Sequence, residues 1–299
     1  MNIIELQGIT KKFNGLIAVD NLSLNVPERS VYGFIGPNGS GKTTTIRMIM
    51  NILYPDNGKI FLFGQERSGA RLDNVGYLPE ERGLYKKMKV KELLQFHGEL
   101  KNGNNINHEI NYWLKKLDLA EWADKKVETL SKGMSQKLQF IVTIIDRPRL
   151  IILDEPFSGL DPVNAEILRL AVLELQKDGA TIIFSTHDMN LAEKMCDYIF
   201  MIYKGKKVLD GTLISIQEKY GSDTIRIHAD KGASAMQNIR GIEKINDFGQ
   251  IQEIRITKDA DTQAILSEIM KRTRIYRFEI TKPSLNDIFI RIASPENTD

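Results

Sequence analysis

The chain has 299 residues, of which 42% are hydrophobic and 27% are charged, and its formal net charge is +2. This length is enough for one large domain or two smaller ones, and the composition is that of an ordinary globular protein. The single cysteine, Cys196, excludes an internal disulfide, the apolar runs are too short to cross a bilayer, and the small net charge does not point to a nucleic-acid partner. The first residues lack a basic start and an apolar run, so we expect no signal peptide.

The first two thirds of the chain are predicted to form an α/β domain. Short alternating or fully apolar segments predict strands, and apolar residues three and four positions apart predict helices. We expect strands at residues 2–8, 22–26, 30–35, 59–63, 150–153, 181–185 and 198–203, and helices at 43–53, 90–100, 106–117 and 135–145. Strands are missing from about residue 82 to 147, which predicts a helical subdomain inserted into the α/β core.

Gly221 marks a second predicted boundary, so we expect a large domain at 1–220 and a small domain at 222–299. In the small domain we expect strands at 224–228, 243–248, 251–256 and 275–280, and helices at 233–239, 262–272 and 285–292. The order βαββαβ, followed by a last helix, predicts a small α+β domain of the ferredoxin-like kind.

A glycine-rich sequence joins the strand at 30–35 to the helix that follows it. It runs Gly36-Pro37-Asn38-Gly39-Ser40-Gly41-Lys42-Thr43 and fits the pattern G-x-x-x-x-G-K-[ST]. Its glycines let backbone N–H groups converge on phosphate oxygens, and the N-terminus of the next helix adds a positive dipole. Lys42 can place its charge on the β- and γ-phosphates, and Thr43 can offer its hydroxyl to Mg²⁺. We predict that this loop, together with Thr44, binds the phosphates of ATP.

The apolar strand at 150–153 ends in two carboxylates, Asp154 and Glu155. An aspartate at this point can hold Mg²⁺ through water, and the glutamate beside it can polarise an attacking water molecule. Acidic residues also end strands simply as solubilising caps, so the pair becomes a strong signal only together with the loop at 36–43.

These motifs, with four others in the right order, identify a resemblance to the ATP-binding-cassette (ABC) ATPases over residues 1 to about 220. The further matches are Leu130-Ser131-Lys132-Gly133-Met134 at the signature LSGGQ, Ser158-Gly159-Leu160-Asp161 at the D-loop, His187 at the switch histidine, and Phe13 at the aromatic that stacks on adenine. The resemblance implies a P-loop NTPase fold of the ABC cassette type with a helical subdomain.

The resemblance also implies a mechanism in which two cassettes pair head to tail and bury two ATP molecules. Each ATP would lie between the 36–43 loop of one subunit and Ser131 and Gly133 of the other. Glu155 would be the general base, and His187 would contact the γ-phosphate and help to hold the attacking water. Asp161 would connect the two sites, and the signature helix, beginning near residue 135, would aim its N-terminal dipole at the γ-phosphate.

The signature departs from the family pattern at two positions. Lys132 and Met134 replace its first glycine and its glutamine, while Ser131 and Gly133, the expected phosphate contacts, are kept. Neutral drift at tolerant positions is the simpler interpretation of this difference.

A third departure lies in Tyr77-Leu78-Pro79-Glu80, where the family usually has glutamine as the last residue. Glu80 brings another carboxylate near Asp154, Glu155 and the phosphates, where like charges repel unless Mg²⁺ is close. We hypothesise that Glu80 ligates Mg²⁺ or its water as glutamine would. A register shifted by one residue would give this place to Glu81.

The segment after Glu80 alternates apolar and basic residues: Leu84, Tyr85 and Met88 with Lys86, Lys87 and Lys89. In transporters of this family the equivalent surface receives a coupling helix from the membrane subunit. We therefore predict an apolar groove with a basic rim here. The alternative is a solvated start of a helix.

The leading hypothesis is the ATP-hydrolysing subunit of an ABC exporter, peripheral on the cytoplasmic face of the cell membrane, with a separate permease and a second cassette as partners. Residues 222–299 resemble the accessory module of NatA-type sodium-efflux and drug-exporter ATPases. The resemblance is carried near the end of the segment by Lys282-Pro283-Ser284-Leu285-Asn286-Asp287-Ile288-Phe289, and it suggests Na⁺ or a drug-like compound as cargo. One alternative is a soluble ABC ATPase acting on ribosomes or nucleic acid, although such relatives usually carry two cassettes or long heptad arms. Another is a regulator with an inactive cassette, which the intact Lys42, Asp154, Glu155 and His187 disfavour.

Overall fold

The computed structural model describes the chain except for residues 68–73, 81–82, 103–105, 221–223, 258 and 294–299. The chain divides into two units, Met1–Thr212 and Leu213–Asp299, and hydrophobic cores form within each of them. The predicted boundary residue Gly221 and the alternative residue Glu81 lie outside the described residues.

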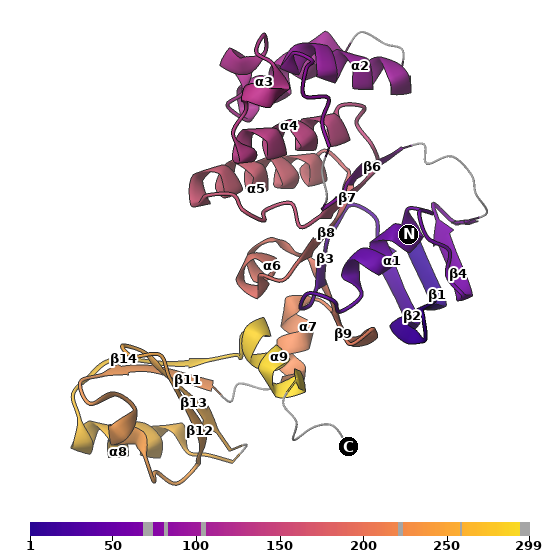
Figure 1. Cartoon of the computed structure of the whole chain (residues 1–299). Helices are drawn as coiled ribbons and strands as arrows, with labels where there is room; N and C mark the ends of the chain where they lie inside the picture. Colours follow the sequence, from indigo (N-terminus) through magenta and orange to yellow (C-terminus); the bar gives the residue numbers. More distant parts are fainter. Residues whose placement is uncertain (68–73, 81–82, 103–105, 221–223, 258, 294–299) are drawn as a thin grey trace. The chain divides into compact units, whose positions relative to one another are not determined.

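A mostly parallel sheet runs through the first unit (Figure 1). Its strand order is β10-β9-β3-β8-β7-β6, and neighbouring strands are parallel except β9 and β10. Both faces are covered, because alternate residues of one strand belong to different cores: Ile151 packs with the helices and Ile152 with the second sheet. The strands are β3 (Val31–Ile35), β6 (Val75–Leu78), β7 (Leu150–Asp154), β8 (Thr181–Thr186), β9 (Tyr198–Tyr203) and β10 (Lys206–Gly211).

An antiparallel sheet in the order β2-β1-β4-β5 shares a core with α1 (Lys42–Ile49) and with one face of the parallel sheet. The first strand was predicted to end at Gly8, but it continues beyond this residue. Gly8 adopts φ +59° at a shift in the strand register, and the strand continues on the other side of this irregularity. Asn14 and Gly15, both with positive φ, form the turn to the next strand. The strands are β1 (Asn2–Phe13), β2 (Leu16–Pro27), β4 (Asn57–Leu62) and β5 (Gln65–Glu66).

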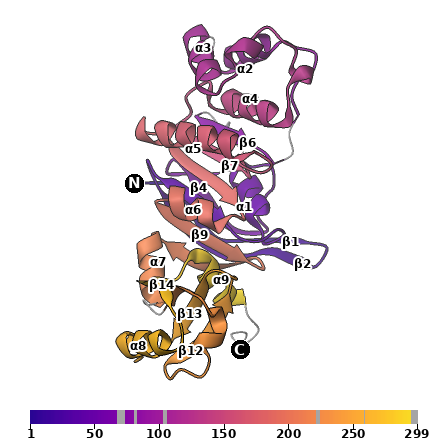
Figure 2. The same ribbon diagram turned by 90° about the vertical axis from the view of Figure 1, so that its left-hand side faces the viewer.

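Helices form the other side of the first unit, where α5 lies between α4 and the parallel sheet (Figures 1 and 2). The packing is continuous, since Leu138 of α4, Leu168 of α5 and Phe184 of β8 belong to one core. The α-helices are α2 (Val90–Asn102), α3 (Asn107–Lys116), α4 (Lys132–Ile144), α5 (Pro162–Lys177) and α6 (Met189–Met195), and short 3-10 turns occupy Ala120–Trp122 and Val127–Thr129.

The start of α4 differs from the prediction. The helix begins at Lys132, not near residue 135, because the hydroxyl of Ser131 accepts a hydrogen bond from the backbone N–H of Met134 and caps the first turn. Strands β6 and β10 were not predicted, since β6 has only four residues and β10 has the mostly polar sequence KKVLDG.

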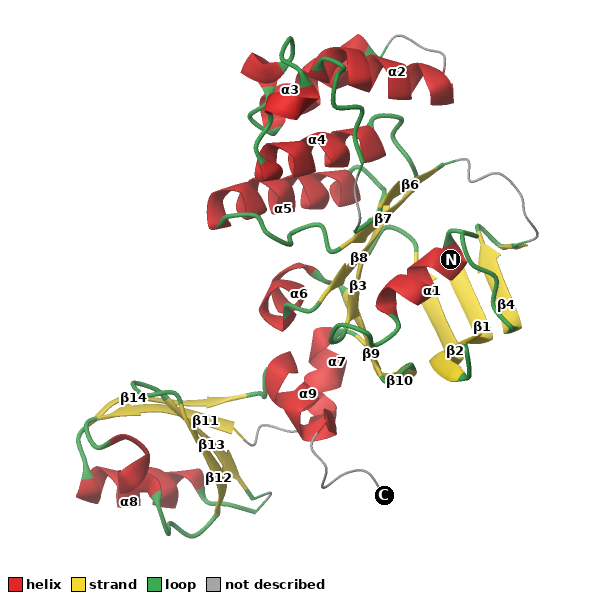
Figure 3. Cartoon of the chain, in the orientation of Figure 1, coloured by secondary structure: helices red, strands yellow, loops and turns green. Residues whose placement is uncertain are grey.

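The second unit contains an antiparallel sheet in the order β12-β13-β11-β14, with helix α8 on one face (Figure 3). Ile225 and Ile254 of the sheet pack with Ile265 and Ile269 of α8. The predicted helix at 233–239 is instead a single 3-10 turn, Gly232–Met236, which begins with a glycine in the left-handed region. The other elements are α7 (Leu213–Tyr220), β11 (Thr224–Ala229), β12 (Ile242–Asp247), β13 (Gln252–Ile256), α8 (Thr262–Arg272), β14 (Ile275–Thr281) and α9 (Leu285–Ala293).

In the described parts of the chain, each helix is too short or too polar to cross a membrane.

Candidate active site

The glycine-rich loop lies between β3 and α1, at the carboxyl end of the parallel strands. Gly36 has φ +154°, and a Cβ atom there would lie 2.2 Å from the carbonyl oxygen of Ile202. Gly41 has φ +113°, and its Cβ would lie 2.6 Å from the carbonyl oxygen of Ala18. Only glycine fits such close approaches of backbone to backbone, so both residues are required to form the loop.

Lys42 folds back over this loop. Its Nζ donates to the carbonyl oxygens of Gly36, at 2.7 Å, and of Pro37, at 3.2 Å, and lies 3.9 Å from Oε1 of Glu155. The side chain is only 5% exposed, and this burial lowers the pKa of Lys42 from its usual value, against the charges of Glu155, Asp154 and Glu80, which raise it. A phosphate in the loop would replace these carbonyl contacts with a stronger, charged partner.

Asp154 and Glu155 follow the buried strand β7. Asp154 is fully buried, and its Oδ1 accepts a hydrogen bond from the hydroxyl of Ser185 on β8. Glu155 has φ +50°, and its backbone N–H donates to the same hydroxyl at 2.9 Å. Ser185 was not predicted as a site residue. Its partners are 31 and 30 positions away along the chain, and only the pairing of Asp154 with Ser185 between the two strands brings them together.

His187 follows β8 and faces the end of β7. Its Nδ1 lies 3.1 and 3.2 Å from the two carboxylate oxygens of Glu155. The histidine side chain is 57% exposed, whereas that of Glu155 is 10% exposed. The imidazole therefore sits on the open side of a buried carboxylate, where it can contact a bound group.

A cavity of about 330 Å³ lies beside the loop and is lined by Lys42 and Glu155, and its volume is within the range of small-molecule sites. Lys42, Thr43, Thr44, Glu80 and Glu155 line it. Its other lining residues are Ala18, Asn38, Gly39, Ser40 and Gly41. The structure thus brings predicted phosphate, metal and base residues to one cavity.

The donor set fits a hydrated Mg²⁺ bound together with phosphate. Two buried oxygens, Oδ2 of Asp154 and Oγ of Ser40, have no hydrogen-bond partner among the residues that the structure describes. Within the same residues there is no cluster of three or more His, Cys, Asp or Glu side chains that could hold a metal alone. Mg²⁺ usually takes one or two carboxylates and completes its shell with phosphates and water, which matches this arrangement.

Eight predicted residues do not line this cavity: Phe13, Gly36, Pro37, Ser131, Gly133, Asp154, Asp161 and His187. Ser131 and Gly133 begin α4, and Asp161 caps α5 by accepting from the backbone N–H groups of Val163 and Asn164. These two segments adjoin each other, since a Cβ at Gly133 would lie 3.4 Å from Leu160. Phe13 is 42% exposed, with Nζ of Lys11 5.7 Å from the centre of its ring.

The predicted groove after Glu80 is only partly apolar at the surface. Leu84 and Met88 are partly buried and pack against the helical core. Tyr85 is 59% exposed and contacts Phe96 of α2 edge to face, with ring centres 5.8 Å apart. The exposed feature is therefore this aromatic pair beside Lys86, whose carbonyl accepts from the N–H of Glu128.

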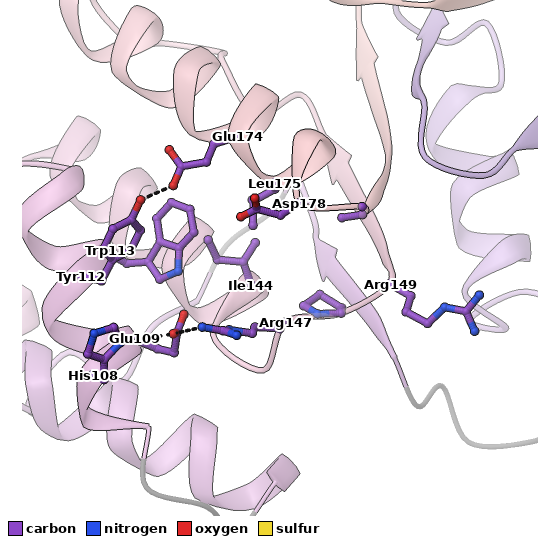
Figure 4. Close-up of a pocket in the computed structure, with 13 residues that line it drawn as sticks. His108, Glu109, Tyr112, Trp113, Ile144, Arg147, Arg149, Glu174, Leu175 and Asp178 are labelled. Atoms are coloured by element: carbon purple, nitrogen blue, oxygen red, sulfur yellow. Dashed lines mark hydrogen bonds and ion pairs between the residues drawn. The ribbon is translucent and has the colours of Figure 1, made fainter.

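A second cavity, of about 550 Å³, lies between α3 and the end of α5 (Figure 4). Glu174 of α5 accepts hydrogen bonds from Tyr112 and Lys116 of α3. Arg147, which follows α4, pairs with Glu109 of α3. The contacts of Glu174 link α3 to α5, the helix that covers the parallel sheet.

Comparisons with known proteins agree with this geometry. The ABC transporter family model matches residues 19–158, a model for the C-terminal domain of DrrA1-3-like ATP-binding proteins matches residues 211–293, and a model of an AAA domain, putative AbiEii toxin of a type IV toxin–antitoxin system, matches residues 126–193. The ABC transporter ATP-binding protein YhaQ of Bacillus subtilis is 39% identical over 290 residues, which cover 96% of this chain and 97% of the relative.

A relative with a named role is the Nod factor export ATP-binding protein I of Burkholderia lata, 29% identical, with 99% of this chain and 98% of the relative covered. A solved structure of the ATP-binding subunit of an ABC transporter has a TM-score of 0.67 and 27% identity, and the match covers 73% of this chain and 93% of that one. ABC cassettes of this kind bind ATP, generally with Mg²⁺. The chain therefore belongs to the ATP-binding proteins of ABC transporters, which are ATPases coupled to transport.

Proposed function

We propose that this chain binds ATP with Mg²⁺ in the cavity at residues 36–44 and hydrolyses it to drive export through a separate membrane permease. The observation that carries the proposal is the meeting of three groups: Nζ of Lys42 is 3.9 Å and Nδ1 of His187 is 3.1 Å from Oε1 of Glu155. A phosphate-binding cation, a buried carboxylate and an exposed imidazole can bind the phosphates, act as a base and position water in phosphoryl transfer to water.

The roles follow from position. The loop N–H groups and Lys42 bind the phosphates, and Glu155 accepts the proton of the attacking water. His187 orients that water and the γ-phosphate. Thr43, Asp154 and Glu80 would hold Mg²⁺, which neutralises charge on the phosphates when it is bound.

A second cassette completes the site in this proposal. Ser131 and Gly133 lie at the N-terminus of α4 and outside the cavity of their own chain, so they are available to an ATP held by another subunit. Asp161 next to them would connect the two sites, and the exposed ring of Phe13 would stack on adenine. The second cassette is another copy or a related chain.

The rest of the assignment is by analogy with the relatives. Residues 1–220, with a helical subdomain at about 82–147, would carry ATP hydrolysis, and residues 222–299 would be an accessory domain. Tyr85 and Phe96 would meet the coupling helix of the permease at the cytoplasmic face of the membrane. The match of residues 211–293 to a DrrA-like domain and the Nod factor export relative support export, with Na⁺ or a drug-like compound as the proposed cargo.

The test is ATP turnover by the purified chain and by Glu155→Gln. We expect Mg²⁺-dependent turnover in the unmutated chain and a loss of at least about 100-fold in the variant, the usual size of a general-base contribution. Nucleotide affinity should change little, because the loop and Lys42 are intact. The matched control is Glu66→Gln, which removes an exposed carboxylate paired with Lys59. Near-normal turnover in Glu155→Gln would exclude Glu155 as the base.

A further inference from the structure

Glu155 has an unusual backbone conformation for the residue that the proposed function makes the base. Its φ of +50° lies in the left-handed region, which residues other than glycine, asparagine and aspartate rarely adopt. Strand β7 ends at Asp154, so the N–H of Glu155 leaves the sheet and must find a partner inside the protein. The orientation of this carboxylate therefore depends on the groups that hold its peptide units.

Three hydrogen bonds fix the turn that begins at Glu155. The hydroxyl of Ser185 accepts from the N–H of Glu155, and the carbonyl of Glu155 accepts from the N–H of Ser158 at 3.2 Å. The side-chain amide of Gln136 donates to the carbonyl of Pro156. Ser185 and Gln136 are both buried, so water cannot replace either partner. The turn is thus held from β8 on one side and from α4 on the other.

Ser185 also controls Asp154. A serine hydroxyl can donate one hydrogen bond, and here it donates to Oδ1 of Asp154. Its oxygen accepts a second hydrogen bond from the backbone N–H of Glu155. This fixes the rotation of the aspartate and leaves its Oδ2 buried, with no hydrogen-bond partner in the described part of the chain. One hydroxyl therefore sets the positions of both carboxylates at the end of β7.

We propose that Ser185 is a positioning residue for hydrolysis, which holds Glu155 toward the attacking water and presents Oδ2 of Asp154 to Mg²⁺. This inference rests on the proposed function and adds a residue to its machinery. Losing the hydroxyl should disturb catalysis and the metal-dependent part of nucleotide binding together, while the phosphate loop stays intact.

The experiment compares Ser185→Ala with Ser185→Thr, which keeps a hydroxyl. We expect kcat of Ser185→Ala to fall about 10- to 100-fold, the effect of misplacing a reacting group by about 1 Å. The dissociation constant of a fluorescent ATP analogue should rise several-fold with Mg²⁺ present and stay unchanged in EDTA. Ser185→Thr should recover most of both quantities. Ser185→Cys, with a similar size and a weaker hydrogen-bonding group, should lie between them.

The chain offers a matched control at the other end of β8. Arg29 is also left-handed, with φ +59°, and its N–H donates at 2.8 Å to the buried hydroxyl of Thr181. Thr181→Val removes the same kind of bond far from the cavity, so it should lower thermal stability as Ser185→Ala does but leave kcat and the Mg²⁺ effect unchanged.

Unchanged kcat and Mg²⁺-dependent binding in Ser185→Ala would overturn the proposal, and so would an equal loss in Thr181→Val. The first result would show that the hydroxyl is dispensable, and the second that any weakening of β8 has the same effect. Failure of the proposed function is a different result, because the unmutated chain itself would then show no Mg²⁺-dependent ATP turnover.

Discussion

Glu80 adds a negative charge to a cavity that already contains Glu155. It is exposed at the edge of the cavity, and its charge is one of those that raise the pKa of Lys42 against the effect of burial. A carboxylate oxygen and an amide oxygen can both ligate Mg²⁺. If Glu80 serves this purpose, its charge is not essential but its oxygen is.

We therefore expect Glu80→Gln to keep Mg²⁺-dependent ATP turnover within about threefold of the unmutated chain, since a good ligand oxygen remains. Glu80→Ala, which removes the oxygen, should need more Mg²⁺ for half-maximal turnover. Steady-state ATPase assays over a series of Mg²⁺ concentrations measure both. Abolished activity in Glu80→Gln would contradict the ligand role.

Single residues of the site were predictable where a short motif carries the chemistry. The spacing of Gly36, Gly41 and Lys42 predicted the loop, and Asp154 and Glu155 were suggested by the strand before them. Ser185 was not predictable, because a serine in an apolar strand has no distinctive pattern of its own. Its importance comes from the register of β7 and β8, which only the folded structure shows.

At the scale of elements, Glu174 connects α5 with α3 across the second cavity (Figure 4). Burial alone would raise the pKa of Glu174, but hydrogen bonds from Lys116 and Tyr112 outweigh it and hold the pKa below its usual value. A lowered folded-state pKa means that the ionised carboxylate stabilises the fold above its unfolded pKa of about 4.3. This stabilisation is lost as the pH falls through the folded-state pKa.

Glu174→Gln should therefore lower the free energy of unfolding by up to about 1 kcal/mol at pH 7, the upper range for a partly exposed ion pair. The difference from the unmutated chain should shrink as the pH falls below about 4, where both carry a neutral side chain. Urea unfolding at several pH values measures this. Glu166→Gln, on the same helix, breaks a local pair with Arg169 and should cost less, because this carboxylate is exposed to solvent. Equal costs for the two variants would mean that the link between helices adds nothing.

Helices and strands were predicted correctly where the periodic spacing of apolar residues is strong. The prediction failed where a local cap or the pairing register sets the ends of an element. The apolar faces of α2 and α3 gave helices within two residues of their observed bounds. The start of α4 was misplaced because the cap by Ser131 overrides the low helix propensity of Gly133. Strand β10 has few apolar residues, so its sequence has no strand pattern. It forms a strand because it pairs with β9.

For the whole molecule, the α/β class followed from the order of strand and helix patterns alone. The strand order of the sheets did not, because pairings such as β3 with β8 join residues about 150 positions apart. In a single chain, the predicted phosphate contacts Ser131 and Gly133 lie outside the cavity that contains Lys42. In the proposed function, a second cassette brings them to a nucleotide.

This incompleteness predicts an ATP-dependent dimer. Glu155→Gln binds ATP without hydrolysing it in the proposed mechanism, so it should accumulate in the paired state when MgATP is present. Light scattering after gel filtration should then give twice the 34.0 kDa of one chain, and the single-chain mass without nucleotide. Adding Lys42→Ala removes the cation that binds the phosphates and should abolish the dimer. A variant that retains bound ATP yet remains a single chain would show that Ser131 and Gly133 of a second copy do not complete this site. The second cassette would then be a different chain.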